Sequence, residues 1–557
     1  MAAVIKVSKV TFRYGVEDED APDTGSPVPG GGPAMPALTD VSFTVPEGSL
    51  TVLCGASGCG KSSALRLLNG LVPHFHTGEL SGSVEVAGRQ VSDSPLVETG
   101  RVSATVFQNP RTQFFTSEVL SELAFRNENY GLDPQLIRDR ISEQGEALGV
   151  AHLLGRNLRQ LSGGELQRVA CAQAVMSNTP VLLFDEPTSN LSVPAIADFA
   201  ALLRRLKADG KTLVVAEHRL AFLEGLADQV LLMEGGRVAR RFTGAEFFAL
   251  TDQQRRDLGL RRLHRDEGVF AGHPPVKDKS VAECPVISEH DAPVQAQTAP
   301  TETGSTPAPS PTAHAGEPIS APVARPAEAL SSPSEPLESG VSLRKIRAGY
   351  GKRIVLEIPA LDLPAGEVTA IVGHNGVGKS TLAKLLSGLL KPLPGGSIYR
   401  HGTLRKPEDL QAETALVMQD VHRQLFSAKV KDEITLGLSK ERQESIDVPG
   451  LLEQFELADL ADRHPLSLSG GQKQRLVIAA AVARDAQLYL FDEPTSGVDY
   501  RHLRRIAARL NELAASGVNV LVITHDPELI DACADSLLVL RPGDRAETAA
   551  TCSYRAI

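Results

Sequence analysis

The chain carries two copies of one phosphate-binding loop, and this repeat constrains its fold more than any other feature. The first copy spans 55–62 and the second 373–380, and both fit the pattern G-x-x-x-x-G-K-S. The glycines let successive backbone N–H groups point at phosphate oxygens. The residues expected to hold nucleotide are Gly55, Gly58, Gly60, Lys61, Ser62 and Ser63 in the first copy, and Gly373, Gly376, Gly378, Lys379, Ser380 and Thr381 in the second.

The same four motifs follow each loop in the same order. They are Gln108, Leu161 to Glu165 (LSGGE), Phe184 to Pro187 (FDEP) and His218 in the first copy, and Gln419, Leu468 to Gln472 (LSGGQ), Phe491 to Pro494 (FDEP) and His525 in the second. From the LSGG motifs onward the offset between the copies is constant at 307 residues. A repeat of this length indicates a duplicated domain rather than a solenoid unit.

Short β-branched runs alternate with helical stretches in both copies. Val181 to Phe184 and Leu488 to Phe491 read as buried strands, and each phosphate loop lies between an apolar run and a helical segment. This alternation predicts a parallel α/β sheet, and the helix that follows the loop completes an anion site.

Length and composition limit the class of protein. With 557 residues the chain is too long for one core, and its net charge of −11 does not favour binding to nucleic acid. The six cysteines form no C-x-x-C pair, which argues against a zinc site or a disulfide framework. We find neither a leader sequence nor an apolar run near the ~20 residues of a membrane helix, so other chains would supply any spanning part.

These observations divide the chain into four parts. We expect a first domain at 1–250, a basic stretch and linker at 251–340, a second domain at 341–545 and a tail at 546–557. Pro274 to Ser339 holds 13 of the 36 prolines and no aromatic residue, which predicts a disordered tether, with a small partner-binding motif as the alternative. A second flexible insert is expected from Glu17 to Pro36. The arginines within 237–265 are read as a solvated helical face or as a membrane-surface or subunit contact.

The FDEP motifs and the histidines supply the expected chemistry. Asp185 and Asp492 end apolar strands, where a carboxylate can hold Mg²⁺ beside the loop serines Ser62 and Ser380. The next residues, Glu186 and Glu493, are placed to orient and polarise an attacking water. His218 and His525 can bind the γ-phosphate or that water. The glutamines Gln108 and Gln419 can ligate Mg²⁺ or water, and we expect both to take part in catalysis.

The LSGG motifs open helices and create a second anion site in each domain. Within one domain this site is surplus, because the phosphate loop already holds the nucleotide. It becomes useful if it closes over the nucleotide of the other domain.

Together these motifs resemble the ATP-binding cassette (ABC) ATPases over residues ~4–250 and ~341–545. The resemblance implies two P-loop domains, each with a RecA-like parallel-sheet core, an antiparallel β subdomain and a helical signature subdomain, which pair head to tail within the chain and bind ATP and Mg²⁺. Lys61 would then share its ATP with Ser469, Gly470, Gly471 and Gln472, and Lys379 with Ser162, Gly163, Gly164 and Glu165. Tyr14 and Tyr350 look like the aromatic residue that stacks on adenine, the alternative being a turn tyrosine.

A finer resemblance follows each loop glutamine. Gln108 to Phe115 and Gln419 to Phe426 share the form Q-x-x-x-x-Q-[FL]-F. It is similar to the segment by which energy-coupling factor ATPases contact their transmembrane coupling subunit. The alternative is amphipathic packing inside each domain. These importers carry vitamins, vitamin precursors or transition-metal ions.

One position departs from the family pattern. Asp499 follows the second FDEP motif as the family prefers, whereas the first domain has Ser192 there. That loop normally touches the phosphate loop of the opposite domain. We therefore hypothesise unequal sites, with the Lys379 site weakened.

The leading hypothesis is the ATPase subunit of an importer at the cytoplasmic face of a membrane. Its partners would be a transmembrane coupling subunit and a substrate-binding membrane subunit, and Gln113, Phe115, Gln424 and Phe426 would pass on the motion. The second hypothesis is a soluble twin-cassette ATPase that acts on ribosomes or nucleic acid. The transported substrate cannot be read from this chain.

Overall fold

The computed structural model describes residues 3–15, 36–263, 335–541 and 551–556, except positions 190, 192, 352, 375, 469 and 496. Ser192 and Ser469 therefore lie outside the described residues. So do the expected insert, apart from Pro36, and the expected linker, apart from its last five residues.

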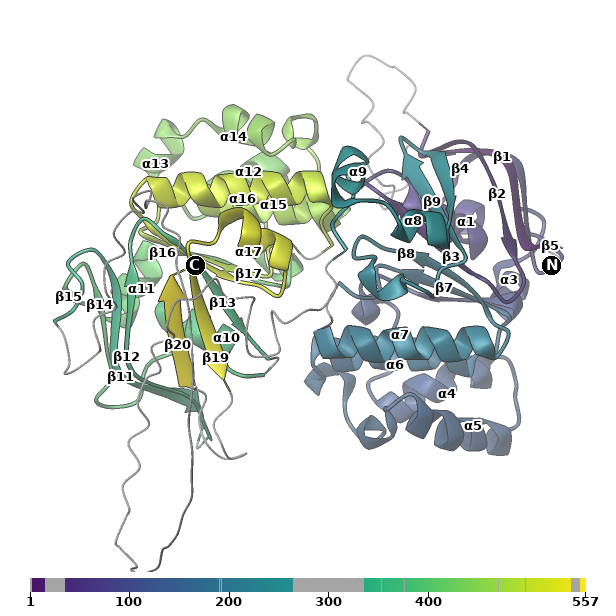
Figure 1. The fold of residues 1–557 in the computed structure, drawn as a ribbon, viewed down its shortest axis with the longest axis horizontal. Coiled ribbons are helices and arrows are strands. Elements are labelled where there is room, and N and C mark those ends of the chain that lie inside the picture. The colour runs from purple at the N-terminus through teal and green to yellow at the C-terminus, as the bar shows by residue number, and fades with distance from the viewer. Residues whose placement is uncertain are drawn as a thin grey trace, which may run out of the picture.

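Two domains of the same architecture lie side by side (Figure 1). Each combines a six-stranded sheet, a four-stranded antiparallel sheet and a group of helices, which confirms the predicted fold class. In spatial order the first six-stranded sheet contains β10 (Arg237–Thr243), β9 (Gln229–Glu234), β3 (Leu50–Gly55), β8 (Thr212–Ala216), β7 (Val181–Asp185) and β6 (Ser103–Val106). The second contains β16 (Thr414–Val417), β17 (Leu488–Asp492), β18 (Asn519–Ile523), β13 (Val368–Gly373), β19 (Ser536–Arg541) and β20 (Thr551–Ala556).

Five strands of each large sheet are parallel, and one edge strand is antiparallel. Every residue of β3 and β8 is buried, as expected of parallel strands whose two faces are both covered. The smaller sheets contain β2 (Leu38–Pro46), β1 (Ala3–Tyr14), β4 (Gly78–Val86) and β5 (Arg89–Gln90) in the first domain, and β12 (Arg353–Pro364), β11 (Gly340–Tyr350), β14 (Ser397–Arg400) and β15 (Thr403–Leu404) in the second.

Helices cover the sheets and extend from them. Those of the first domain are α1 (Lys61–Leu68), α2 (Leu71–His74), α3 (Leu96–Val102), α4 (Val119–Asn129), α5 (Pro134–Ala147), α6 (Gly163–Met176), α7 (Val193–Ala208), α8 (Gly244–Phe248) and α9 (Asp252–Asp257). Those of the second are α10 (Lys379–Leu386), α11 (Pro407–Glu413), α12 (Val430–Thr435), α13 (Lys440–Ser445), α14 (Val448–Gln454), α15 (Gly470–Ala483), α16 (Tyr500–Ala515) and α17 (Pro527–Cys533).

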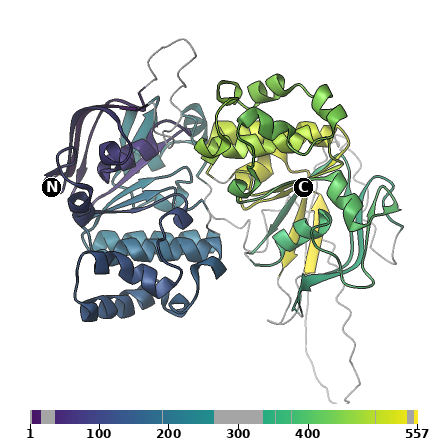
Figure 2. The ribbon, with the colours of Figure 1, turned by 180° about the vertical axis from the view of Figure 1, so that it is seen from behind.

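The two domains point in opposite directions. In Figure 1, α4 and α5 lie at the bottom of the right-hand domain, whereas α13 and α14 lie at the top of the left-hand one. Seen from behind, the four-stranded sheets lie on the outer flanks and the large sheets lie toward the middle (Figure 2). This head-to-tail arrangement brings different parts of the two domains face to face.

Two of the expected domain boundaries differ from the structure: the end of the first domain and the end of the second. The first domain does not stop at 250, because α9 and the buried Leu260 continue to pack on its core. The segment assigned to a tail at 546–557 includes β20, which pairs with β19. Neither extension carries a motif, so the repeat alone did not show them.

The arginines at 237–265 do not form one solvated helical face. Arg237, Arg240 and Arg241 lie on the edge strand β10, and Arg255 is fully buried with its guanidinium over the Phe247 ring. Arg261 is 6% exposed and forms ion pairs with two carboxylates of the second domain.

The Arg261 contact ties the two domains together. Its guanidinium pairs with Asp526 and with Glu528, the latter at 2.9 Å, and the backbone N–H of Arg262 donates to Glu528 at 2.7 Å. All three charged side chains are buried. Figure 1 shows α9 of the first domain beside one end of α16 of the second.

Removing Arg261 should be costly because it would leave two carboxylates buried without their cation. We expect Arg261→Met to destabilise the docked structure by about 3–5 kcal/mol, measured by urea unfolding. Arg262 is the matched control, since its side chain pairs with Asp531 at a half-exposed position, and Arg262→Met should cost about 0–1 kcal/mol. Equal effects of the two variants would contradict this role of Arg261.

The Arg261 contact should also depend on pH. Burial alone would raise the pKa of Asp526, but Arg261 and Arg219 outweigh it and lower the pKa from 3.8 to about 2. A lowered carboxylate pKa stabilises the fold above the unfolded value, and this contribution is lost as the pH falls toward the folded value. The stability difference between the natural chain and Arg261→Met should therefore shrink between about pH 5 and about pH 2.5. A difference that stays constant over this range would count against the ion pair.

Candidate functional site

The first phosphate loop joins β3 to α1 and holds its lysine at the base of the loop. Lys61 is 5% exposed, and its ammonium donates to the carbonyl oxygens of Gly55 at 3.1 Å and Ala56 at 3.0 Å. Gly60, with φ of 102°, caps α1, and a Cβ there would lie 2.9 Å from the Ala37 carbonyl oxygen. The turn therefore needs glycine, and it aims the amides at the start of α1 into the loop.

The second loop repeats this geometry between β13 and α10. The Lys379 ammonium donates to the carbonyl oxygens of Gly373 at 2.7 Å and His374 at 3.2 Å. In both domains the ammonium also lies beside the histidine that follows the neighbouring parallel strand, at 3.1 Å from Nε2 of His218 and 3.0 Å from Nε2 of His525. The sequence-predicted lysines and histidines therefore meet at both sites.

Each loop serine lies against the aspartate predicted to share a metal with it. The Ser62 hydroxyl donates to Asp185 at 3.1 Å, and the Ser380 hydroxyl donates to Asp492 at 3.2 Å. Mg²⁺ prefers oxygen ligands and is usually held by one or two carboxylates together with substrate phosphates. The described residues contain no cluster of three or more His, Cys, Asp or Glu side chains that could hold a metal by itself. The serine–aspartate pairs fit a Mg²⁺ that arrives with the nucleotide and neutralises its phosphate charge.

The expected base of the first site has two polar partners. Gln108 donates its side-chain amide to Glu186 at 2.7 Å, and Nε2 of His218 lies 3.3 Å from the same carboxylate. Burial works to raise the pKa of Glu186, but His218 and Lys61 outweigh it and the pKa is lowered. Glu186 has a φ of +44°, a strained conformation for a residue with a side chain, which is characteristic of functional positions. The carboxylate is therefore ionised and fixed, as a base that accepts a proton from water must be.

The second site has the same residues in a different electrostatic state. Nε2 of His525 lies 3.8 Å from Glu493, whose φ is +52°. Burial raises the pKa of Glu493 to about 7, whereas burial and the charge of Lys379 lower the pKa of His525 to about 3. His525 is therefore neutral and accepts from the lysine, while Glu493 is ionised less readily than Glu186.

The signature segment of the first domain closes the second site. A cavity of about 290 Å³ spans the two domains and is lined by residues of both. The lining residues are Ser162, Gly163, Gly164, Ser189, Leu191 and Arg219 from the first domain, and Gly376, Gly378, Lys379, Ser380, Thr381, Gln419, Asp492, Glu493 and His525 from the second.

The second domain approaches the first site in the same way. A Cβ built on Gly471 would lie 3.9 Å from the Ser57 hydroxyl, and one on Gly470 would lie 3.5 Å from the Gln108 amide. The Ser57 backbone N–H donates to Asp499 at 2.7 Å, so the aspartate after the second FDEP motif contacts the first loop. Its counterpart Ser192 lies outside the described residues.

Some expected nucleotide contacts take other roles. Glu165 accepts from the backbone and hydroxyl of Ser162 and pairs with Arg156 at 2.8 Å, so it caps α6 rather than lining the cavity. Tyr14 is 6% exposed, its ring makes T-shaped contacts with the rings of Phe12 and His76, and its hydroxyl lies 3.2 Å from that of Ser63. Contrary to expectation, Tyr14 offers no open face to adenine, whereas Tyr350 is 49% exposed.

Sequence reasoning missed two residues at the sites. Arg219 lines the second cavity although it belongs to the first domain. Glu217 is 3% exposed and accepts hydrogen bonds from the backbone and hydroxyl of Thr188. The sequence did distinguish these two positions, because the copies differ there: the second domain has Thr524 and Asp526 where the first has Glu217 and Arg219.

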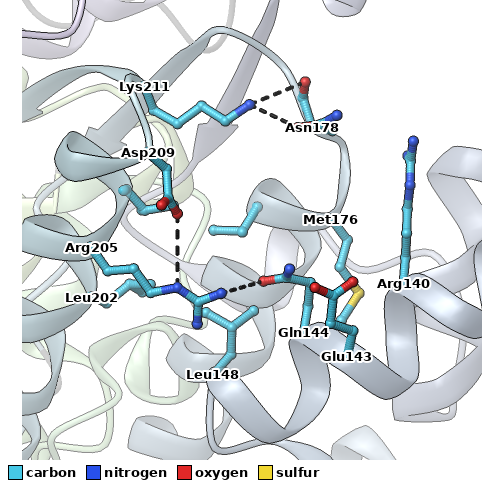
Figure 3. A pocket seen from close by; sticks show the side chains of 12 residues that line it. Arg140, Glu143, Gln144, Leu148, Met176, Asn178, Leu202, Arg205, Asp209 and Lys211 are labelled. Carbon is cyan, nitrogen blue, oxygen red and sulfur yellow. Dashed lines mark hydrogen bonds and ion pairs between the residues drawn. The ribbon is translucent and has the colours of Figure 1, made fainter.

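A larger crevice of about 350 Å³ lies away from both sites, where α5 and the end of α6 meet α7 (Figure 3). Its polar groups largely satisfy one another: Lys211 donates to Asn178 at 2.8 Å, and Arg205 donates to Gln144 at 3.2 Å and pairs with Asp209. We read it as the joint between the helical region and the sheet core.

Comparison with known proteins agrees with this geometry. The family model described as "ABC transporter" matches residues 38–189 and 356–496. The chain belongs to the ABC transporter family. Domains of this family bind and hydrolyse ATP, and the loops of both domains are the candidate ATP sites.

Relatives match over nearly the whole length. The chain is 34% identical to a "Putative ABC transporter ATP-binding protein" of Treponema denticola, over 91% of this chain and 92% of the relative. It is 31% identical to the "Putative HMP/thiamine import ATP-binding protein YkoD" of Bacillus subtilis, over 91% and 87%. Among solved structures, the archaeal ribosome recycling factor aABCE1 shares the twin-domain fold at a TM-score of 0.54 and 22% identity, over 98% and 89%. In the described part of the chain, no helix combines the length and apolar character needed to cross a membrane.

The electrostatic difference between the sites predicts unequal hydrolysis. Glu186→Gln should lower ATP turnover by about 100-fold or more, because it removes an ionised base from the site that Asp499 completes. Glu493→Gln should cost several-fold less, because its carboxylate is partly protonated near neutral pH. Steady-state phosphate release from the two variants measures this, and equal losses would refute unequal sites.

Proposed function

We propose that this chain is the ATP-hydrolysing subunit of a membrane importer of the energy-coupling factor type, bound peripherally at the cytoplasmic face. Its partners would be a transmembrane coupling subunit and a substrate-binding membrane subunit. The cargo would be a vitamin, a vitamin precursor or a metal ion. The observation that carries the proposal is a pair of exposed phenylalanines at matched positions.

Phe115 and Phe426 are the most exposed large apolar side chains among the described residues, at 75% and 76%. Both end a Q-x-x-x-x-Q-[FL]-F segment. The preceding Leu425 is buried and the matching Phe114 packs against the core of the first domain, so each segment turns one apolar residue inward and the next one outward. Internal packing therefore does not account for the two phenylalanines, and such exposed apolar groups commonly mark an interaction site.

A buried glutamate holds each phenylalanine in place. Glu122 on α4 accepts from the backbone N–H groups of Phe115 at 3.0 Å and Thr116 at 2.8 Å. Glu433 on α12 does the same for Phe426 at 3.0 Å and Ser427 at 2.7 Å. These charge-assisted bonds fix the backbone, so the phenylalanine is presented rigidly rather than on a loose loop.

A groove of about 200 Å³ lies beside Phe426. Its apolar lining includes Leu416, Leu436, Val477, Ala480 and Ala481. A helix from a membrane partner that placed an apolar side chain here would also contact Phe426.

The glutamines of the two segments form hydrogen bonds within their own domains. Gln113 is 7% exposed, accepts from the Phe107 backbone N–H at 3.0 Å and donates to Gln173. Gln424 accepts from the Met418 N–H at 2.7 Å and donates to the Leu416 carbonyl oxygen. The glutamines therefore connect the exposed segment to the strand and loop that carry Gln108 and Gln419. This connection gives motion at the ATP sites a route to the phenylalanines.

In this proposal ATP binding closes the domains, and hydrolysis reopens them. The work comes from the difference in ATP affinity between the closed and open states. The name of the Bacillus subtilis relative, which refers to HMP/thiamine import, supports a vitamin or vitamin precursor as cargo.

The test is purification of the tagged chain from gently solubilised cells, followed by mass spectrometry of the proteins that accompany it. We expect multi-spanning membrane proteins with the natural chain and their loss with Phe115→Ser/Phe426→Ser. Phe75→Ser is the matched control, because Phe75 is 63% exposed and lies outside both segments.

Two outcomes would overturn the proposal. One is recovery of ribosomal proteins or nucleic acid without a membrane partner, which would favour the soluble twin-cassette class. The other is equal retention of membrane partners by the double variant and by the Phe75→Ser control.

A further inference from the structure

The two domains differ in charge at the residue that follows the histidine. This residue is Arg219 in the first domain and Asp526 in the second, at the constant offset of the repeat. Both follow a buried parallel strand, β8 or β18, near the middle of the molecule. A cation and an anion at matched positions, each beside a candidate ATP site, indicate that the two positions have different roles.

In the second domain this position has a structural task. Asp526 is 3% exposed and accepts from the hydroxyl of Thr495, the threonine of the FDEPT motif, at 2.7 Å. It also pairs with Arg261 of the first domain. Asp526 thus ties the histidine segment to the segment that carries Glu493.

In the first domain another residue performs that task. Glu217, two positions earlier, accepts from the backbone N–H of the matching Thr188 at 3.2 Å and from its hydroxyl. Its second oxygen accepts from the His218 backbone N–H at 2.7 Å. Because Glu217 accepts the hydrogen bonds of Thr188, position 219 does not need a carboxylate for this purpose and can be an arginine.

Arg219 points instead toward the ATP site of the other domain. It lines the 290 Å³ cavity together with Lys379, Ser380 and Glu493. Among the described residues its guanidinium makes no hydrogen bond or ion pair, although the side chain is half-buried. Its charge is felt across the interface, where it opposes the rise that burial causes in the pKa of Glu493.

We propose that Arg219 binds the terminal phosphate oxygens of the ATP held by Lys379, so that the second site receives an arginine from the opposite domain and the first site does not. A guanidinium offers a planar fork of donors that suits phosphate oxygens. The residue matched to Arg219 is the carboxylate Asp526, which is buried against Arg261 and would repel phosphate. Asymmetry is thus built into the chain through opposite charges at one repeated position.

The test isolates the second site with Lys61→Ala, which disables the first loop. In this background, isothermal titration calorimetry with Mg²⁺ and a non-hydrolysable ATP analogue should show affinity about tenfold lower for Arg219→Gln. Arg219→Lys should retain part of the affinity, because it keeps the charge but loses the fork. ADP, which lacks the terminal phosphate, should bind Arg219→Gln almost as well as the natural residue.

Two controls separate a phosphate contact from a general effect on the interface. Arg219→Gln in a Lys379→Ala background should leave analogue affinity at the first site unchanged. Arg262→Gln removes another partly exposed arginine near the interface and should not alter binding at either site. Unchanged analogue affinity in Lys61→Ala/Arg219→Gln, or equal losses for the analogue and ADP, would overturn the proposal.

Discussion

The placement of both phosphate loops at the interface between the domains is the constraint on which the rest of the structure depends. Each loop supplies a lysine, a serine and the amides of a helix N-terminus, which neutralise one side of a nucleotide. The other side is open toward the opposite domain. The head-to-tail arrangement fills it with a signature segment whose glycines allow close approach, so each ATP site is assembled from two domains.

The domains that build these sites are duplicates, but the sites are not equal. Asp499 contacts the first loop, and Glu186 is held ionised by His218, Lys61 and Gln108. At the second site burial raises the pKa of Glu493, and Arg219 enters from the other domain. Small exchanges at matched positions have therefore changed the charge around each nucleotide without changing the fold.

Much of the fold and of the sites could be predicted because the motifs are local. A loop of fixed spacing, an aspartate at the end of an apolar strand and a histidine after the next strand take their positions from the parallel sheet itself. The lysine–histidine and serine–aspartate contacts follow from that topology, since the carboxyl ends of neighbouring parallel strands meet at one edge.

What the sequence did not reveal depends on contacts between distant segments. Arg261 carries no motif, and only the docked domains show that it neutralises Asp526 and Glu528. The strand β20 carries no motif, although it takes the same edge place beside β19 that β10 takes beside β9. Tyr14 is buried by His76, which is distant in sequence. Arg219 was visible only as a mismatch between copies, and its meaning required the interface.

The most direct test of shared, unequal sites is a cryo-electron microscopy reconstruction of Glu186→Gln/Glu493→Gln with ATP and Mg²⁺. We expect two ATP molecules, each between the phosphate loop of one domain and the signature segment of the other, with Arg219 at the second and Asp499 at the first loop. Nucleotides held by single domains, with both signature segments turned away, would contradict it.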